Sequence, residues 1–234
     1  MNSASGKQRL QDLECFYGLL GALKTLTGAK ALKECDGRMD WPLKGVYFFF
    51  EEGERRSDSG AGLRAVRVGT HALKMGSKTS LWTRLSQHRG QSGSGGGNHR
   101  GSVFRLLVGE ALITRDRLES ETWGKGNTAP REIRKEEQDI EKTVTQHIGN
   151  LPFLYLKIED EPGPDSLRGV IERNSIALLS NFGKAEIDPP SNRWLGSLSN
   201  RKRVRMSGLW NQNHVEEGYD PKFLDILEAL INKG

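Results

Sequence analysis

One short segment constrains the fold of this chain more than any other. The run GVYFFFE, residues 45–51, consists almost wholly of apolar, aromatic and β-branched residues, which favour a buried strand. A polar, glycine-containing stretch follows over residues 52–62, and then LRAVRVG at residues 63–69, where apolar and basic residues nearly alternate. We therefore expect two strands of a hairpin, joined by a polar turn.

Helices are expected on both sides of this hairpin in the sequence. Residues 9–26 carry apolar positions at helical spacing, which predicts an amphipathic helix. Residues 80–89 predict another helix, with Ser80 as a candidate N-cap. Further helices are expected at residues 101–115, 131–148, 166–182 and 220–233, and a third strand, PFLYLKI, at residues 152–158. Few strands mixed with many helices indicate an α+β fold.

Composition limits the class of protein. The chain has 234 residues, of which 35% are hydrophobic, enough for one sizeable core. Its two cysteines are too few for a disulfide scaffold and are not spaced as a zinc site. There is no long apolar run and no signal-peptide layout, so we expect a cytoplasmic protein that does not bind membranes. The net charge of +5 and the basic first half suit a nucleic-acid partner or simply a solvated face.

Three side chains near the hairpin could carry chemistry. Tyr47 stands in the buried strand, where a tyrosine is by default a core residue with a satisfied hydroxyl. Arg84 and His88 lie four residues apart, which places both on one face of the predicted helix. An arginine can clamp a phosphate, and a histidine can hold a proton. An isolated arginine–histidine pair on a helix is usually exposed and without a function, so its significance depends on the neighbouring sequence motifs.

Two other segments leave alternatives open. The glycine-rich run QSGSGGGN, residues 91–98, is either a plain linker or a loop that lets the backbone approach a ligand closely. The basic cluster RKRVR, residues 201–205, is either an exposed loop or a contact to backbone phosphate.

The order of these features resembles the GIY-YIG nuclease family, in particular its restriction-endonuclease branch. GVY on one strand, RVG on its partner and R-x-x-x-H on the next helix carry the resemblance. It implies a nuclease domain over residues 44–195, with a small three-stranded mixed or antiparallel sheet flanked by helices. Residues 1–43 would form a helical extension, and residues 196–234 a C-terminal extension whose last helix packs on the domain.

The same resemblance assigns residues further along the chain. Glu172 takes the place of the family's metal-binding glutamate, and Asn192 that of its late asparagine, with Asn181 as a weaker rival. The implied cofactor is Mg²⁺, or another divalent cation such as Mn²⁺, because a lone carboxylate with waters and substrate oxygens suits it. Tyr47 would act as general base, while Arg84 neutralises charge on the transferring phosphate and His88 hydrogen-bonds the tyrosine.

The chain departs from the family pattern at one position. Arg67 stands where the second signature tyrosine is expected. His71, just after RVG, is either a proton-handling group near the missing tyrosine or a polar residue at a strand end. His99 and Arg100, beside the glycine-rich run, are expected to contact phosphate or bases of the substrate, as is Arg67.

The expected function is therefore a metal-dependent endonuclease acting on nucleic acid, with DNA the expected substrate and a homodimer possible by resemblance. One alternative is a catalytically impaired nucleic-acid-binding module, which the arginine at position 67 favours. Another is a scaffold protein that uses the same fold and whose basic residues only solvate its surface.

Overall fold

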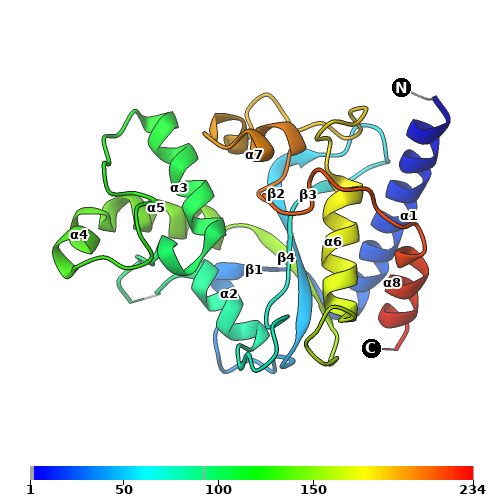
Figure 1. The fold of residues 1–234 in the computed structure, drawn as a ribbon, viewed down its shortest axis with the longest axis horizontal. Helices are drawn as coiled ribbons and strands as arrows, with labels where there is room; N and C mark the ends of the chain where they lie inside the picture. Colours follow the sequence, from blue (N-terminus) through cyan, green and yellow to red (C-terminus); the bar gives the residue numbers. More distant parts are fainter. Residues whose placement is uncertain (1–2, 92, 234) are drawn as a thin grey trace.

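A single antiparallel sheet organises the molecule in the computed structural model, which describes residues 3–91 and 93–233 (Figure 1). Its strand order is β1-β4-β2-β3, and the strands are β1 (Lys30–Ala31), β2 (Gly45–Arg55), β3 (Leu63–Gly69) and β4 (Pro152–Lys157). The predicted α+β class is confirmed. The expected three strands are joined by β1, whose two residues are too few to produce a sequence pattern.

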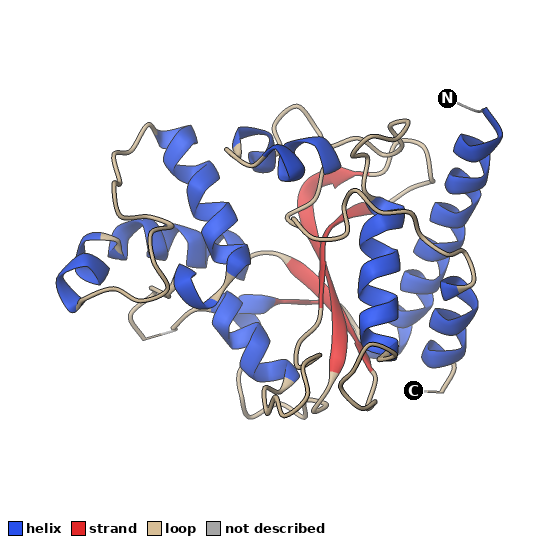
Figure 2. Cartoon of the chain, viewed as in Figure 1, coloured by secondary structure: helices blue, strands red, loops and turns tan. Residues whose placement is uncertain are grey.

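One face of the sheet is covered by three helices (Figure 2). They are α1 (Ser3–Thr27), α6 (Leu167–Leu179) and α8 (Phe223–Ile231). Successive side chains of a strand point to opposite faces, and Val46 and Phe48 of β2 point into this core. The terminal helix α8 packs against α1 and α6.

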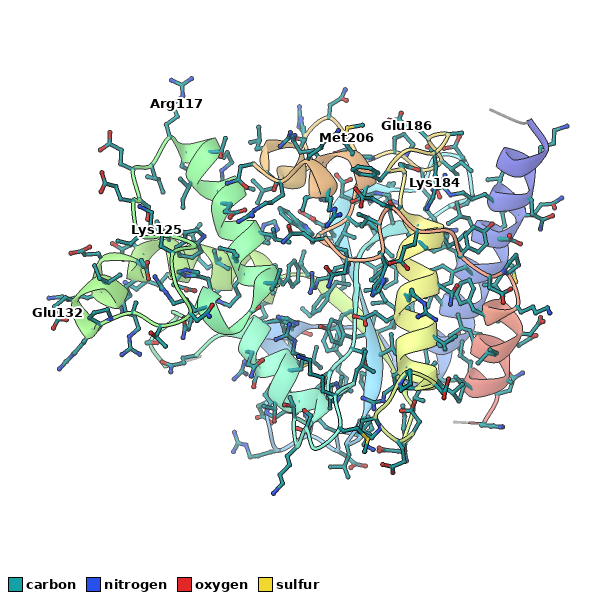
Figure 3. The ribbon with its side chains drawn as sticks, viewed as in Figure 1. Arg117, Lys125, Glu132, Lys184, Glu186 and Met206 are labelled. Carbon is teal, nitrogen blue, oxygen red and sulfur yellow. The ribbon has the colours of Figure 1, made fainter. Side chains whose placement is uncertain are left out.

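The other face carries a second core, to which Tyr47 and Phe49 of β2 contribute. It lies under α2 (Leu81–Arg89), α3 (Val103–Asp116), α5 (Gln138–Gly149) and the short helix α7 (Lys202–Ser207). The short helix α4 (Arg131–Glu136) contacts α5 and has no buried residue. Side chains fill the space between the sheet and the helices on both sides (Figure 3). Because β2 is buried on both faces, its sequence is apolar throughout its first half rather than alternating.

Several sequence predictions differ from the structure in detail. The helix expected over residues 131–148 is divided at Glu137 into α4 and α5. The basic cluster at residues 201–205 lies largely in α7 rather than in a loop. Trp194 and Trp210 belong to the second core, on the face away from α8.

The chain segments outside residues 44–195 contribute directly to the sheet. Lys30 of β1 pairs with Phe153 of β4. At the other edge, the backbone N–H of Trp210 donates to the carbonyl of Val66 in β3. The division at residues 43 and 195 stays a prediction. No helix in the described ranges is both long and apolar enough to cross a membrane.

The register of β2 and β3 brings the two signature segments together. Tyr47 pairs with Gly69, and Phe49 with Arg67, so all four residues lie on the face of the second core. A Cβ atom added at Gly69 would lie 2.3 Å from the Tyr47 hydroxyl oxygen. Glycine is thus required here because the tyrosine side chain crosses directly over its Cα.

We expect Gly69→Ala to destabilise the fold by about 3 kcal/mol, since the added methyl group overlaps the tyrosine. Urea unfolding measures the loss. Gly101→Ala is the matched control, because nothing lies within 4 Å of its added Cβ; it should change stability by about 0.5 kcal/mol or less. Equal stability of the two variants would contradict the packing described.

Candidate active site

A buried hydrogen-bond chain begins at Tyr47. Its hydroxyl lies 2.8 Å from Nε2 of His88, and Nδ1 of the same ring lies 2.7 Å from Oγ of Ser102. Ser80 caps the helix that carries His88, accepting from the Thr83 N–H as predicted. With the proton on Nδ1, the ring donates to Ser102 and presents a bare Nε2 to the tyrosine hydroxyl.

The charge state of His88 follows from its surroundings. The side chain is fully buried. Burial, followed by the positive charges of Arg84, Arg67 and Arg105, holds the pKa of His88 well below its usual value. The imidazole is therefore neutral near pH 7, and one of its ring nitrogens can accept a proton.

Two arginines lie close to this chain. Arg84 is half-buried and donates to Oε1 of Gln87 at 3.0 Å and to the carbonyl of Gly101 at 3.2 Å. Arg67 is buried, donates to the carbonyl of Trp210 and lies 4.7 Å from the ring centre of Phe104. Its Nε has no hydrogen-bond partner among the described residues. Desolvation lowers the pKa of Arg67, while Tyr47 opposes that shift through its charge and a hydrogen bond.

Glu172 reaches the same place from the opposite side of the sheet. It belongs to α6, is half-buried, and accepts a 3.0 Å hydrogen bond at Oε1 from the N–H of Thr70, the residue after β3. Burial raises the pKa of this carboxyl, whereas the Thr70 N–H and the charges of Arg67, His214 and Arg84 lower it. The carboxylate has no ion pair in the described part of the chain.

The predicted residues lie together around the end of β3. Tyr47 pairs with Gly69, Arg67 lies two residues earlier on β3, and Thr70 just after the strand binds Glu172. Arg84 lies on α2, the helix that carries His88. A tyrosine–histidine pair, two arginines and a lone carboxylate thus surround the end of β3. Arginines beside a carboxylate that can bind a cation form an arrangement suited to holding a phosphodiester.

A family model described as GIY-YIG domain matches residues 7–234, almost the whole chain. The chain belongs to the GIY-YIG family. No curated protein and no solved structure matches it. The GIY-YIG match extends over both terminal segments, in agreement with their pairing to β4 and β3.

Other predicted residues of this GIY-YIG chain lie at or beyond the margin of the site. His71 is buried, its Nε2 donates to the carbonyl of Leu43, and its Nδ1 has no partner among the described residues. Burial lowers the pKa of His71 to about 4, so the ring is neutral. Its contact with Leu43 fixes the chain after β3, which is the role of a polar residue at a strand end.

The structure does not bring Asn192 to the site. The side chain is exposed, and the neighbouring Ser191 bonds to Glu54, which lies about 20 Å along β2 from Tyr47 at ordinary strand rise. Asn181 is buried and its amide is engaged by Arg9 and Ile187. Sequence distance alone gave no means of placing either asparagine.

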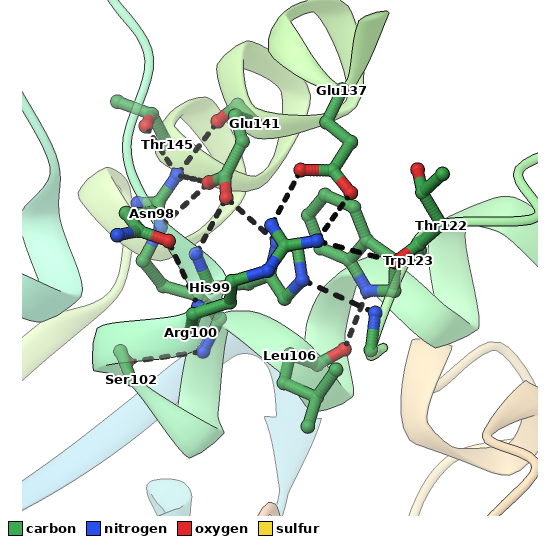
Figure 4. A network of polar contacts seen from close by, with 12 residues as sticks. Asn98, His99, Arg100, Ser102, Leu106, Thr122, Trp123, Glu137, Glu141 and Thr145 are labelled. Carbon is green, nitrogen blue, oxygen red and sulfur yellow. Dashed lines mark hydrogen bonds and ion pairs between the residues drawn. The ribbon is translucent and has the colours of Figure 1, made fainter. Parts of the chain in front are cut away.

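His99 and Arg100 are also held inside the protein rather than offered to a substrate (Figure 4). His99 is buried, donates from Nδ1 to Glu141 at 3.0 Å, and stacks on Trp123 at 3.9 Å between ring centres. Arg100 forms a two-pronged ion pair with Glu137 at 2.6 and 2.8 Å. Since these groups already have partners, neither is available for phosphate or base contact.

A second buried ion pair anchors the same network. Arg105 is fully buried and donates from Nε to Oε2 of Glu141 at 2.9 Å and from Nη1 to the carbonyl of His88 at 2.9 Å. It thereby ties α3 and α5 to the last turn of α2, which carries His88. The sequence marks Glu141 only as part of a charged helix face.

Glu141→Gln should lower the free energy of unfolding by about 3 kcal/mol or more, because it leaves the Arg105 charge buried without a counterion. Chemical denaturation monitored by tryptophan fluorescence measures the change. Asp139→Asn on the same helix is the control: it removes an exposed pair with Lys142 and should have almost no effect. A small loss in both variants would show that the buried pair contributes little.

Sequence reasoning missed three residues that hold the site together. Ser102 orients His88, and Thr70 orients Glu172. Asn211 accepts from the N–H of Val68 and donates to its carbonyl, so it continues the sheet beside Gly69. Ser102 could have been found as the N-cap of α3, a position that favours serine. Nothing in the sequence pairs the other two with their partners.

A buried carboxyl lies behind Trp210, whose carbonyl binds Arg67. Oε2 of Glu51 accepts from the indole N–H groups of Trp194 and Trp210, and Oε1 lies 3.5 Å from Nε2 of His147. Burial raises the pKa of Glu51 to about 7 and lowers that of His147 to about 4. Between these values both groups are neutral, so the contact is not an ion pair.

This shift predicts a pH dependence of stability. The pKa of Glu51 is near 4.5 in the unfolded chain and about 7 in the folded protein. Between these pH values the native state binds more protons at Glu51 than the unfolded state does. The contribution of Glu51 to the free energy of unfolding is therefore present at low pH and lost as the pH rises. The free energy of unfolding of Glu51→Gln, relative to that of wild type, should therefore increase by up to about 3 kcal/mol from pH 5 to pH 8. Unfolding at both pH values tests this, with the exposed Glu52→Gln as control; a constant difference would contradict it.

Proposed function

We propose that this GIY-YIG protein is a metal-dependent endonuclease that hydrolyses phosphodiester bonds of nucleic acid, with DNA as its substrate. The observation that carries the proposal is the convergence of the Tyr47–His88 pair, two arginines and Glu172 at the end of β3. The residues combine a proton acceptor, positive charge for a phosphate and a ligand for a cation, which phosphodiester hydrolysis requires.

Glu172 fits the divalent cation that the family implies. One of its oxygens is engaged by the Thr70 N–H, and the other has no protein partner in the described ranges. Those ranges contain no cluster of three or more His, Cys, Asp or Glu side chains that could form an all-protein metal site. A single carboxylate completed by water and substrate oxygens suits Mg²⁺ or Mn²⁺. When bound, such an ion polarises the phosphate and stabilises the leaving oxygen.

The remaining steps use side chains of the chain itself. His88 is neutral, so its Nε2 can accept the Tyr47 proton while the Nδ1–H stays bonded to Ser102. Tyr47 relieved of its proton can take one from the attacking water. Arg84, which is half-buried, neutralises charge on the phosphate. Arg67 adds a second positive charge beside the tyrosine.

One observation favours a second candidate function. Tyr47 is completely buried, so the attacking water must reach a hydroxyl that has no contact with solvent in the free protein. Together with Arg67 in place of the second tyrosine, this burial supports a nucleic-acid-binding module that no longer cuts. In such a module Arg84 binds phosphate, and the buried Arg67 and the Tyr47–His88 pair support the sheet.

Cleavage assays with two variants separate these functions. With supercoiled plasmid and single-stranded DNA, wild type should cut with Mg²⁺ and not with chelator. Glu172→Gln and Tyr47→Phe should each reduce the rate by about 100-fold or more, because they remove the cation ligand and the proton acceptor. Glu186→Gln changes an exposed carboxylate and should retain full activity, while circular dichroism checks that all variants fold.

Salt-dependent binding without any cleavage by wild type would establish the second candidate instead. Full activity in both site variants would refute the assignment of the catalytic residues. Absence of both cleavage and binding to duplex DNA at low salt would leave only a scaffold role.

A further inference from the structure

A hollow of about 1190 Å³ lies beside the proposed active site. Its walls are the last turn of α2, the glycine-rich loop that follows it, and the facing sides of α4 and α5. The loop and the two helices lie on the same side of the sheet as His88, away from α1, α6 and α8 (Figure 1). None of the site residues proposed above lines this hollow.

The hollow is strongly basic. Its cationic lining consists of Arg89, Arg131, Arg134 and Lys135. The last three are exposed and form no ion pair within the described part of the chain. Glu141 is the one carboxylate among the lining residues, and its charge is offset by the buried Arg105.

The acidic residues of α4 do not cancel this charge. Glu132 and Glu136 are not among the lining residues, and Glu132 points away from the molecule at the outer end of the helix (Figure 3). The positive side chains of α4 therefore face a hollow that contains no free carboxylate, which favours a polyanionic ligand.

The described part of the glycine-rich loop packs against the buried Arg105. The Gln91 N–H donates to the carbonyl of Gly96 at 2.7 Å, which closes the loop on itself. A Cβ at Gly97 would lie 2.2 Å from the Arg105 guanidinium, and Gly90 has a φ of +82°. Glycines thus let this backbone lie against Arg105.

The hollow borders Arg84 through two of its lining residues. Gln87 and Gly101 both line it, and both are hydrogen-bonded to Arg84, the proposed phosphate ligand, at 3.0 and 3.2 Å. A phosphate held by Arg84 would therefore lie next to the basic hollow.

We propose that this hollow binds the sugar-phosphate backbone of the nucleic-acid strand next to the cleaved bond. This inference rests on the proposed function and adds to it a second contact surface. Exposed arginines and lysines beside open backbone suit phosphates of any sequence, so the surface adds affinity and fixes the path of the strand without reading bases. Arg131, Arg134 and Lys135 supply the charge.

The test compares two triple variants that remove the same charge. One is Arg131→Ala/Arg134→Ala/Lys135→Ala, in the hollow. The control is Lys7→Ala/Lys222→Ala/Lys233→Ala, three exposed lysines on α1 and at the two ends of α8, which cover the opposite face of the sheet. Binding of a random-sequence duplex several helical turns long is measured in chelator over a range of salt concentrations, and plasmid cleavage is measured with Mg²⁺.

The hollow variant should bind at least about tenfold more weakly than wild type, and the slope of log Kd against log salt should fall by about 2 to 3. Its cleavage rate at saturating protein should be unchanged, because the catalytic groups are intact. The control should retain the wild-type affinity and slope.

Equal weakening in both triple variants would show an effect of net charge alone and would overturn the inference, as would wild-type binding by the hollow variant. In either case wild type still binds and cuts, so the proposed function stands. Failure of wild type to bind or cut any nucleic acid would instead overturn the proposed function, and the role of the hollow with it.

Discussion

Burial of β2 on both faces is the constraint on which the rest of the structure depends. The strand lies between β4 and β3, and its alternate side chains enter two separate cores. Phe48 holds the layer of α1, α6 and α8, whereas Tyr47 and Phe49 hold the layer that carries α2 and α3. Because successive residues must point in opposite directions, Tyr47 is fixed toward α2, where His88 meets it.

The properties of the site follow from the burial of ionisable side chains around Tyr47. Burial keeps His88 neutral, and it places Arg67 where its positive charge acts on Tyr47 and Glu172. Charges interact more strongly in such surroundings than at an exposed surface. Glu172 comes from the other side of the sheet and reaches the site only because Thr70, just beyond β3, receives it.

Arg105 connects this site to the basic hollow. One of its nitrogens donates to the carbonyl of His88, its other groups are bound by Glu141, and Gly97 of the loop lies against its guanidinium. A single buried ion pair thus supports both the helix that carries His88 and the wall of the surface proposed to bind the strand. Residues remote from the chemistry fix its geometry in this way.

The sequence by itself determined the hairpin, the helix with Arg84 and His88, the α+β class and the family. These follow from local patterns, since apolar runs, capping residues and helical spacing act between near neighbours in the chain. Only the tertiary structure decided that His99 and Arg100 are bound by Glu141 and Glu137, and that Asn192 lies away from Tyr47. Those outcomes depend on contacts between residues far apart in sequence. The type of a polar residue does not reveal whether its partner is a phosphate or a buried carboxylate.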